Sequence, residues 1–202
     1  MVEEILNQIS GASPLIIYLS LFFFSYIENV FPPSPSDLVV VVGGSLISTG
    51  VISFIPTLII TSVGSVLGFL TLYYIGKQLD KKLVRTGKIK WISIEALDKA
   101  ESWFNKYGYY VILANRFMPG TRSVISFFAG VSELKIKKTI LFASISAVAW
   151  NAIIIYLGVI FGDNVPLIDS YLSTYSNIVI IATAVIALIF VIRFLFLRKK
   201  KK

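Results

Sequence analysis

Residues 115–123 read NRFMPGTRS, a stretch in which Arg116 and Arg122 stand six positions apart around a Pro-Gly pair. The apolar run VILA precedes it and the apolar run VISFFAG follows it. A charged side chain at membrane depth is costly, and proline interrupts a helix because it lacks a backbone donor. The stretch therefore predicts a break in a membrane-embedded helix, with charges that serve a function.

The composition is that of a membrane protein with several spanning segments. Of the 202 residues 56% are hydrophobic, and the mean hydropathy is +0.81, which is too apolar for an ordinary soluble domain. Histidine and cysteine are both absent, which excludes disulfides, thiolate or imidazole metal sites and any histidine base. We therefore expect no enzyme activity, no cofactor and no metal. Proton handling has to fall to Asp, Glu, Lys or Tyr.

Positive charge is unevenly distributed along the chain. The first Lys or Arg is Lys77, and the cations cluster in residues 77–106, 135–138 and 193–202. Each cluster adjoins an apolar segment, which is the pattern of the positive-inside rule and argues against a nucleic-acid partner. The rule predicts a multi-pass protein of the plasma membrane with these clusters and the C-terminus in the cytoplasm. The cation-free N-terminus is expected outside or at the interface.

Three segments are apolar and long enough to cross a hydrocarbon core of about 30 Å. They are residues 51–76, 139–161 and 177–197. Between the first two, Ser93 to Lys106 has apolar residues at helical spacing, including Ile94, and Gly108 follows its end. This pattern predicts an amphipathic helix on the membrane surface.

Two further apolar stretches are expected to enter the membrane and return to the same side. Residues 107–131 separate two cytoplasmic clusters, and two full spans there would need about 40 residues. Residues 14–49 are interrupted by FPPSPSD; two short spans are the alternative, but they leave two acids beside a cytoplasmic turn without cations. Proline and glycine mark the tips of these re-entrant hairpins, at Pro33 and Pro35 in the first and at Pro119 and Gly120 in the second.

The order of elements repeats along the chain. An amphipathic start, a broken hairpin and a glycine-containing span fill roughly residues 1–76, and the order recurs in opposite orientation in roughly 92–162. Inverted-topology repeats with broken helices are common in secondary transporters. The predicted fold is an all-α membrane protein with two opposed re-entrant hairpins, about three full spans and amphipathic interfacial helices. Residues 1–162 form the transport core, and 163–202 supply an external loop, a final span and a basic tail.

The two hairpins carry opposite charges. Glu28 and Asp37 flank the first tip, and Arg116 and Arg122 flank the second. If the hairpins enter from opposite faces, their tips meet near the midplane, and two carboxylates face two guanidiniums. One interpretation is that the four charges only pair and hold the hairpins together, although buried ion pairs contribute little to stability.

The alternative, which we favour, is that the arginine hairpin binds an anionic headgroup. Guanidinium groups present a planar donor fork that suits phosphate or carboxylate, and the start of a half-helix adds hydroxyl and backbone donors. The residues expected to contact a phosphate are Arg116, Thr121, Arg122 and Ser123. Glu28 and Asp37 are expected to carry a proton that couples binding to the membrane gradient, or to hold the arginines when the site is empty.

The same residues carry a resemblance to a known family. The matching features are Glu28-Asn29, Pro33-x-Pro35-x-Asp37, Gly43-Gly44, Tyr73-Tyr74-Ile75-Gly76-Lys77, Trp103-Phe104-x-Lys106-Tyr107-Gly108, Asn115-Arg116-Phe117-x-Pro119-x-x-Arg122, Gly130, Trp150, Gly158 and Gly162. Over roughly residues 15–162 the chain resembles the DedA family, also called the SNARE-associated Golgi or VTT-domain family. One departure is Ser36, where bacterial members often have glycine.

The resemblance implies a transporter that moves a phosphate-bearing lipid between leaflets, as a flippase or a scramblase. Bacterial members are implicated in the return of undecaprenyl phosphate, and eukaryotic relatives scramble phospholipids. The family's required acids and arginines correspond to Glu28, Asp37, Arg116 and Arg122. The expected partners are therefore a membrane lipid and protons, and self-association stays open. Other classes also stay open: a proton-coupled transporter of a small solute or ion, and a non-catalytic membrane assembly factor.

Overall fold

A computed structural model describes residues 13–31, 36–79, 94–117 and 121–162. Regular structure within these ranges is entirely helical, as the sequence predicted. The elements in chain order are α2 (Pro14–Val30), α3 (Ser36–Ser48), α4 (Phe54–Gln78), α6 (Ile94–Tyr107), α7 (Tyr110–Ala114), the 3₁₀ turn η1 (Asn115–Phe117), α8 (Arg122–Val131) and α9 (Ile136–Phe161). The last predicted span, residues 177–197, lies outside the described residues.

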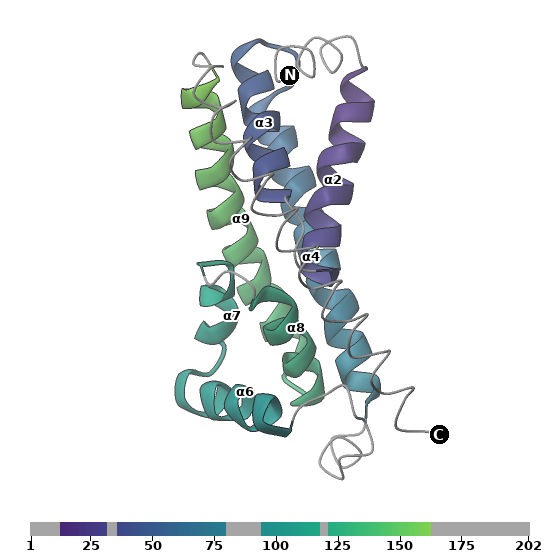
Figure 1. The fold of residues 1–202 in the computed structure, drawn as a ribbon, viewed down its shortest axis with the longest axis vertical. Coiled ribbons are helices and arrows are strands. Elements are labelled where there is room, and N and C mark those ends of the chain that lie inside the picture. The colour runs from purple at the N-terminus through teal and green to yellow at the C-terminus, as the bar shows by residue number, and fades with distance from the viewer. Residues whose placement is uncertain (1–12, 32–35, 80–93, 118–120, 163–202) are drawn as a thin grey trace, which may run out of the picture.

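Helices α4 and α9 are long and apolar and extend along the bundle (Figure 1). Their 25 and 26 residues correspond to about 38 Å of helix, more than the hydrocarbon core of about 30 Å. Only 39% and 28% of their most apolar windows are buried, so they expose apolar surface that a soluble protein would cover. The spans predicted over 51–76 and 139–161 are thus confirmed as helices of spanning length and composition.

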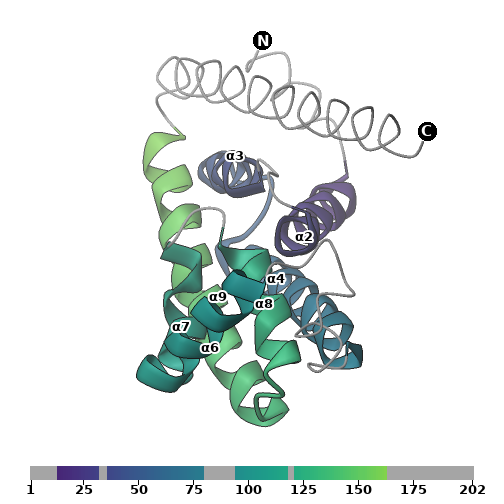
Figure 2. The ribbon, with the colours of Figure 1, turned by 60° about the horizontal axis from the view of Figure 1, so that its bottom comes forward.

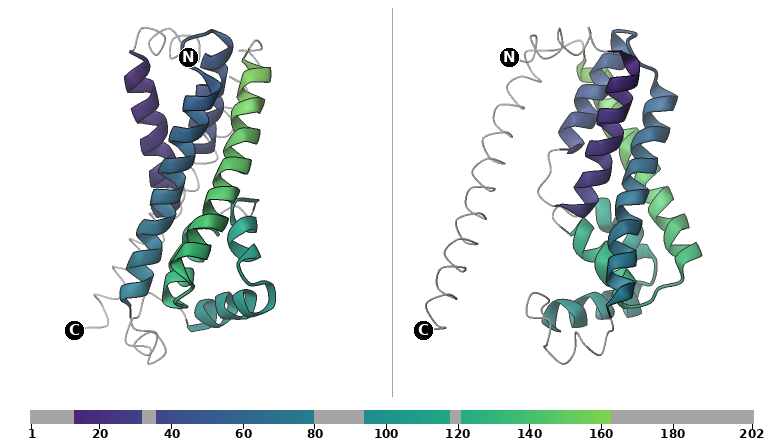
Figure 3. Two further views of the ribbon diagram at one scale, coloured as in Figure 1. Left: turned by 180° about the vertical axis from the view of Figure 1, so that it is seen from behind. Right: turned by 90° about the vertical axis from the view of Figure 1, so that its right-hand side faces the viewer.

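The shorter helices form two broken pairs that approach the middle of the bundle from opposite ends. Helix α2 runs from the top toward the middle and α3 returns to the top, whereas α7 rises from the lower part and α8 descends again (Figures 1 and 3). In each pair, one helix ends before the predicted tip and the next begins after it. The tips themselves, with Pro33, Pro35, Pro119 and Gly120, lie outside the described residues.

The second helix of each broken pair packs against the long helix that follows the other pair in the chain. Helix α3 lies along α9, and α8 lies along α4. Glycines form both crossings: Gly44 of α3 meets Gly158 of α9, and Gly130 of α8 meets α4 near Gly76. A Cβ added at any of these glycines would collide with backbone atoms of the facing helix. The main chains therefore touch directly, in the close contact that small residues permit between membrane helices.

The predicted amphipathic helix is confirmed as α6, which lies across the lower end of the bundle (Figures 1 and 2). Leu97, Ala100 and Phe104 are buried in one cluster with residues of α7 and α8. Ile94, which the spacing also suggested for this face, is exposed. Gly108 follows the helix with φ +58°, a left-handed conformation that glycine adopts without a steric penalty and that often ends helices.

Candidate functional site

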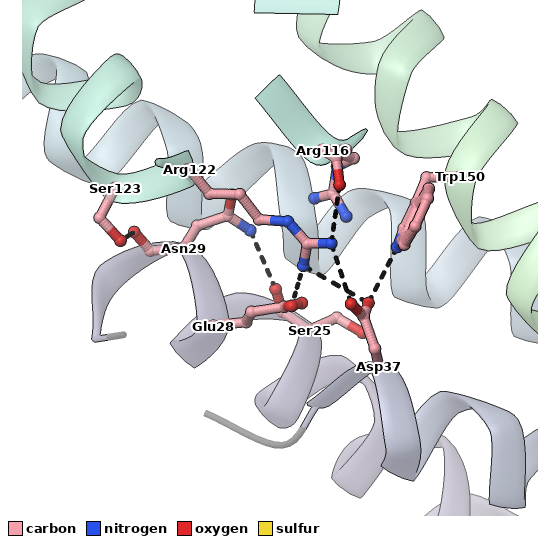
Figure 4. Close-up of polar contacts among 8 residues, drawn as sticks. All are labelled: Ser25, Glu28, Asn29, Asp37, Arg116, Arg122, Ser123 and Trp150. Atoms are coloured by element: carbon pink, nitrogen blue, oxygen red, sulfur yellow. Dashed lines mark hydrogen bonds and ion pairs between the residues drawn. The ribbon is translucent and has the colours of Figure 1, made fainter. Parts of the chain in front are cut away.

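The predicted acids and arginines converge where the two broken pairs meet (Figure 4). Glu28 lies in the last turn of α2 and Asp37 in the first turn of α3. Arg116 belongs to η1, and Arg122 is the first residue of α8. Because each pair is broken, these side chains project from four helix ends toward one point. The residues therefore form one cluster although they are up to 94 positions apart in the chain.

Arg122 occupies the centre of the cluster and binds both acids. Its Nη1 donates to Oε1 of Glu28, and its Nη2 donates to Oδ2 of Asp37 at 2.9 Å. Nη1 also lies 3.4 Å from Oδ1 of Asp37, and Nη2 donates to the main-chain oxygen of Arg116 at 3.1 Å. The Arg122 and Glu28 side chains are 10% and 11% exposed, whereas the Asp37 side chain is 34% exposed. The cluster is buried, and Asp37 lies at its open side.

Arg116 is held differently from Arg122. The residue is only 4% exposed, and its Nη1 is buried without a hydrogen-bond partner within the described part of the chain. The Asp37 carboxylate acts on this guanidinium electrostatically. A buried donor left unpaired costs free energy, and such groups usually mark the place of a water, an ion or a ligand. The expectation that two carboxylates face two guanidiniums is therefore refined, because both acids bind Arg122 directly and Arg116 keeps an unused donor.

Trp150 of α9 belongs to the cluster, although the residue pattern alone did not assign it a role there. Its Nε1–H donates to Oδ1 of Asp37 at 2.9 Å. Its ring lies 5.4 Å from Cζ of Arg122, and Phe117 packs edge-on against it at 5.1 Å between centroids. One indole thus contacts both partners of the ion pair, through a hydrogen bond and a cation–π contact. A tryptophan in the middle of a span was the available signal.

The two predicted hydroxyl residues lie at the start of α8. Ser123 donates from Oγ to the main-chain oxygen of Asn29 at 2.7 Å, and the buried Asn29 in turn donates from Nδ2 to the carbonyl of Ser25 at 3.3 Å. The serine therefore satisfies a carbonyl in the last turn of α2, where intrahelical partners are missing. Thr121 occupies the N-cap position of α8. A contact between either hydroxyl and a phosphate stays a prediction.

The chemistry available in the cluster is anion binding and proton exchange. Two guanidiniums provide donors in a buried site, where charge-assisted hydrogen bonds are strong. Two carboxylates provide groups that can take up a proton. Within the described ranges, no three or more His, Cys, Asp or Glu side chains gather as a metal would require.

These features define a helical membrane protein with a buried charge cluster between two broken helix pairs. The VTT-domain family model matches residues 34–160, so the chain belongs to the VTT-domain, or DedA, family of membrane proteins. The resemblance seen in the sequence is thereby confirmed. The matched range contains Asp37, both arginines and Trp150, and it begins after Glu28.

Relatives in several bacteria align with most of the chain. Undecaprenyl phosphate transporter A of Bacillus subtilis is 32% identical over 161 residues, which cover 79% of this chain and 81% of the relative. The protein of the same name in Staphylococcus aureus is 30% identical, and the alignment covers 92% of this chain and 94% of that relative. An alkaline phosphatase-like protein of Lactococcus lactis is 33% identical, and the alignment covers 100% of this chain and 92% of that relative. No solved structure gives a significant match.

Proposed function

We propose that this protein translocates a phosphate-bearing lipid between the leaflets of its membrane, in a process coupled to protons. The substrate class is a polyprenyl phosphate or a phospholipid. The observation that carries the proposal is the buried Nη1 of Arg116, which has no hydrogen-bond partner in the described part of the chain, beside a second buried arginine. The names of the Bacillus and Staphylococcus relatives, which are undecaprenyl phosphate transporters, support the same substrate class.

In this proposal the broken pairs are re-entrant hairpins that enter from opposite membrane faces. The two pairs approach the charge cluster from opposite ends of the bundle (Figure 3), and each crosses the opposite long helix at glycines. Residues 1–76 and 92–162 would be the two inverted repeats of the transport core. Non-helical backbone at membrane depth is tolerated where protein buries it or where it lines a cavity, which is the setting that a transport path requires.

The proposed phosphate site lies between Arg116 and Arg122, with Thr121 and Ser123 as additional hydroxyl contacts. The break between the arginines lets them approach one anion from two sides. Lysine keeps the charge but loses the planar fork. We expect Arg116→Lys and Arg122→Lys each to weaken phosphate binding by about 1.5–3 kcal/mol, which is roughly a tenfold to hundredfold loss of affinity.

The test is lipid binding and translocation by the purified protein in liposomes. The probes are a labelled polyprenyl phosphate, the matching alcohol and inorganic phosphate, so that a lipid headgroup and a free anion are told apart. Arg85→Lys is the matched control, because it changes an arginine of the cytoplasmic cluster in the same way. The proposal fails if alcohol and phosphate lipids bind equally and neither substitution in the cluster changes their binding. Transport of inorganic phosphate alone would instead indicate a small-solute transporter.

Proton coupling has its own test. Glu28→Gln and Asp37→Asn remove a charge with little change in shape, so we expect the fold to survive and gradient-driven transport to stop. Normal transport by both variants under an imposed proton gradient would refute the coupling role. Loss of folding in both would favour a purely structural ion cluster.

A further inference from the structure

Arg122 is already occupied by the protein's own oxygens. Its two Nη atoms donate to Glu28, to both carboxylate oxygens of Asp37 and to the carbonyl of Arg116. Among the described residues, the cluster thus contains one arginine with an unused buried donor and a second arginine whose fork is bound by two internal carboxylates (Figure 4). A phosphate entering the cluster finds Arg116 available and Arg122 blocked.

We propose that Glu28 and Asp37 are internal competitors that a phosphate has to displace from Arg122, so that the protein binds phosphate more tightly when these carboxylates are protonated. This inference rests on the proposed function and specifies its regulation. Arg116 makes the first contact with the anion, and Arg122 is released to complete the clamp.

Charge neutrality gives the direction of the coupling. Two ionised carboxylates and two guanidiniums have a formal net charge of zero, so a phosphate that enters leaves the buried cluster negative. Uncompensated charge is costly in a site of low dielectric. Uptake of one proton by a carboxylate compensates a phosphate monoanion, and uptake by both compensates a dianion. A protonated carboxyl also loses its strong attraction for Arg122, so protonation and phosphate binding favour each other, as linkage requires.

The neighbours of Arg122 suit this exchange. Among the described contacts of Arg122, the charged partners are Glu28 from α2 and Asp37 from α3, and the main-chain oxygen of Arg116 in η1 accepts a further bond. Helix α9 contributes Trp150, whose side chain does not titrate. Its Nε1–H donates a hydrogen bond of 2.9 Å to Oδ1 of Asp37. Asp37 therefore keeps one donor when Arg122 turns toward the phosphate. Its greater exposure, 34% against 11% for Glu28, makes it the acid that is more accessible to a proton.

Trp150 also supplies a direct readout. The Arg122 guanidinium lies 5.4 Å from its ring, so movement of Arg122 changes the surroundings of this indole. The other two tryptophans, Trp91 and Trp103, are replaced by phenylalanine to leave Trp150 as the single tryptophan, which is excited selectively over the tyrosines. Titration of this protein in nanodiscs then reports occupancy of the cluster, and native mass spectrometry counts the bound probe.

The probes separate titration of the ligand from titration of the protein. Farnesyl phosphate carries a monoester, which gains a second charge near pH 6, whereas its methyl diester stays a monoanion; farnesol and inorganic phosphate complete the set. For the diester we expect affinity to rise from about pH 8 to about pH 5, by up to tenfold per pH unit for each proton taken up. Glu28→Gln and Asp37→Asn should bind the diester about tenfold more tightly than wild type near pH 8. Each of these two variants should also show a weaker dependence of diester affinity on pH. The control Glu95→Gln, at an exposed acid of α6, should change neither the affinity at pH 8 nor its pH dependence.

The outcomes are distinguishable. If the diester binds but its affinity does not depend on pH, or if both neutralised variants bind it more weakly, internal competition is refuted while the phosphate site stands. The wild-type pH series decides this point even if a variant fails to fold. If phosphate probes bind no better than farnesol at any pH, the proposed function itself fails. Binding of inorganic phosphate as tight as that of the diester would refute a lipid as the source of the anion.

Discussion

Replacing Arg122 with methionine removes the cation that Glu28 and Asp37 share. Breaking a buried ion pair by deleting one partner typically costs about 3–5 kcal/mol, because the remaining charge is uncompensated. Here the Asp37 side chain is 34% exposed and retains the Trp150 N–H, and both acids can respond by taking up a proton. We therefore expect Arg122→Met to lower the free energy of unfolding by about 3 kcal/mol, at the low end of that range.

Arg116→Met is the matched substitution. It makes the same change in charge and volume, in the same broken pair, six residues away. Arg116 has no direct ion pair among the described contacts and buries an unpaired Nη1, so methionine removes an unfavourable group together with its longer-range attraction to Asp37. Exchanging a poorly satisfied buried charge for an apolar side chain is often neutral or stabilising. We therefore expect Arg116→Met to change the free energy of unfolding by no more than about 1 kcal/mol.

The assay is reversible unfolding in mixed detergent micelles, followed by tryptophan fluorescence, with wild type and both variants measured side by side. Binding of farnesyl phosphate is measured on the same samples, and both variants should lose it. Equal destabilisation by the two substitutions would refute the uneven pairing seen in the cluster. Retained phosphate binding by a folded Arg116→Met protein would remove the basis for the proposed site.

Helix packing, the Trp150 hydrogen bond and the membrane topology can each be tested by substitution. Gly130→Ala should lower the free energy of unfolding by about 1–3 kcal/mol, because its Cβ meets backbone atoms of α4. The atoms nearest to a Cβ at Gly43 belong to the Leu21 side chain, so Gly43→Ala should lower it by less in the same unfolding assay. Trp150→Phe removes the N–H that donates to the Asp37 carboxylate and should lower the free energy of unfolding by about 1.5 kcal/mol. An unchanged unfolding midpoint would contradict that hydrogen bond. Single cysteines at positions 50 and 90, in a chain that has none, should react with an impermeant thiol reagent from outside and from the cytoplasm respectively; outside labelling at position 90 would overturn the topology.

Membrane class, long helices and helix breaks were predictable from the sequence because they depend on local composition. An apolar run of spanning length has few alternatives to a helix in lipid, since every backbone group must be satisfied internally. Proline beyond the first turn of a helix removes a backbone donor and kinks or breaks the helix, so the ends of α2 and η1 and the starts of α3 and α8 were expected near the observed places. The amphipathic spacing of α6 was equally local, although it also included the exposed Ile94.

The partners within the charge cluster could not be predicted in the same way. The sequence identified two acids and two arginines that were expected to face one another, without saying which acid binds which arginine. The tertiary structure directs both carboxylates to Arg122 and leaves Nη1 of Arg116 without a hydrogen-bond partner among the described residues. It also brings Trp150 to Asp37 across 113 positions of chain. Which donor meets which acceptor depends on how α3 and α8 cross the long helices at their glycines, and that three-dimensional packing is not encoded in the spacing of residues along any one segment.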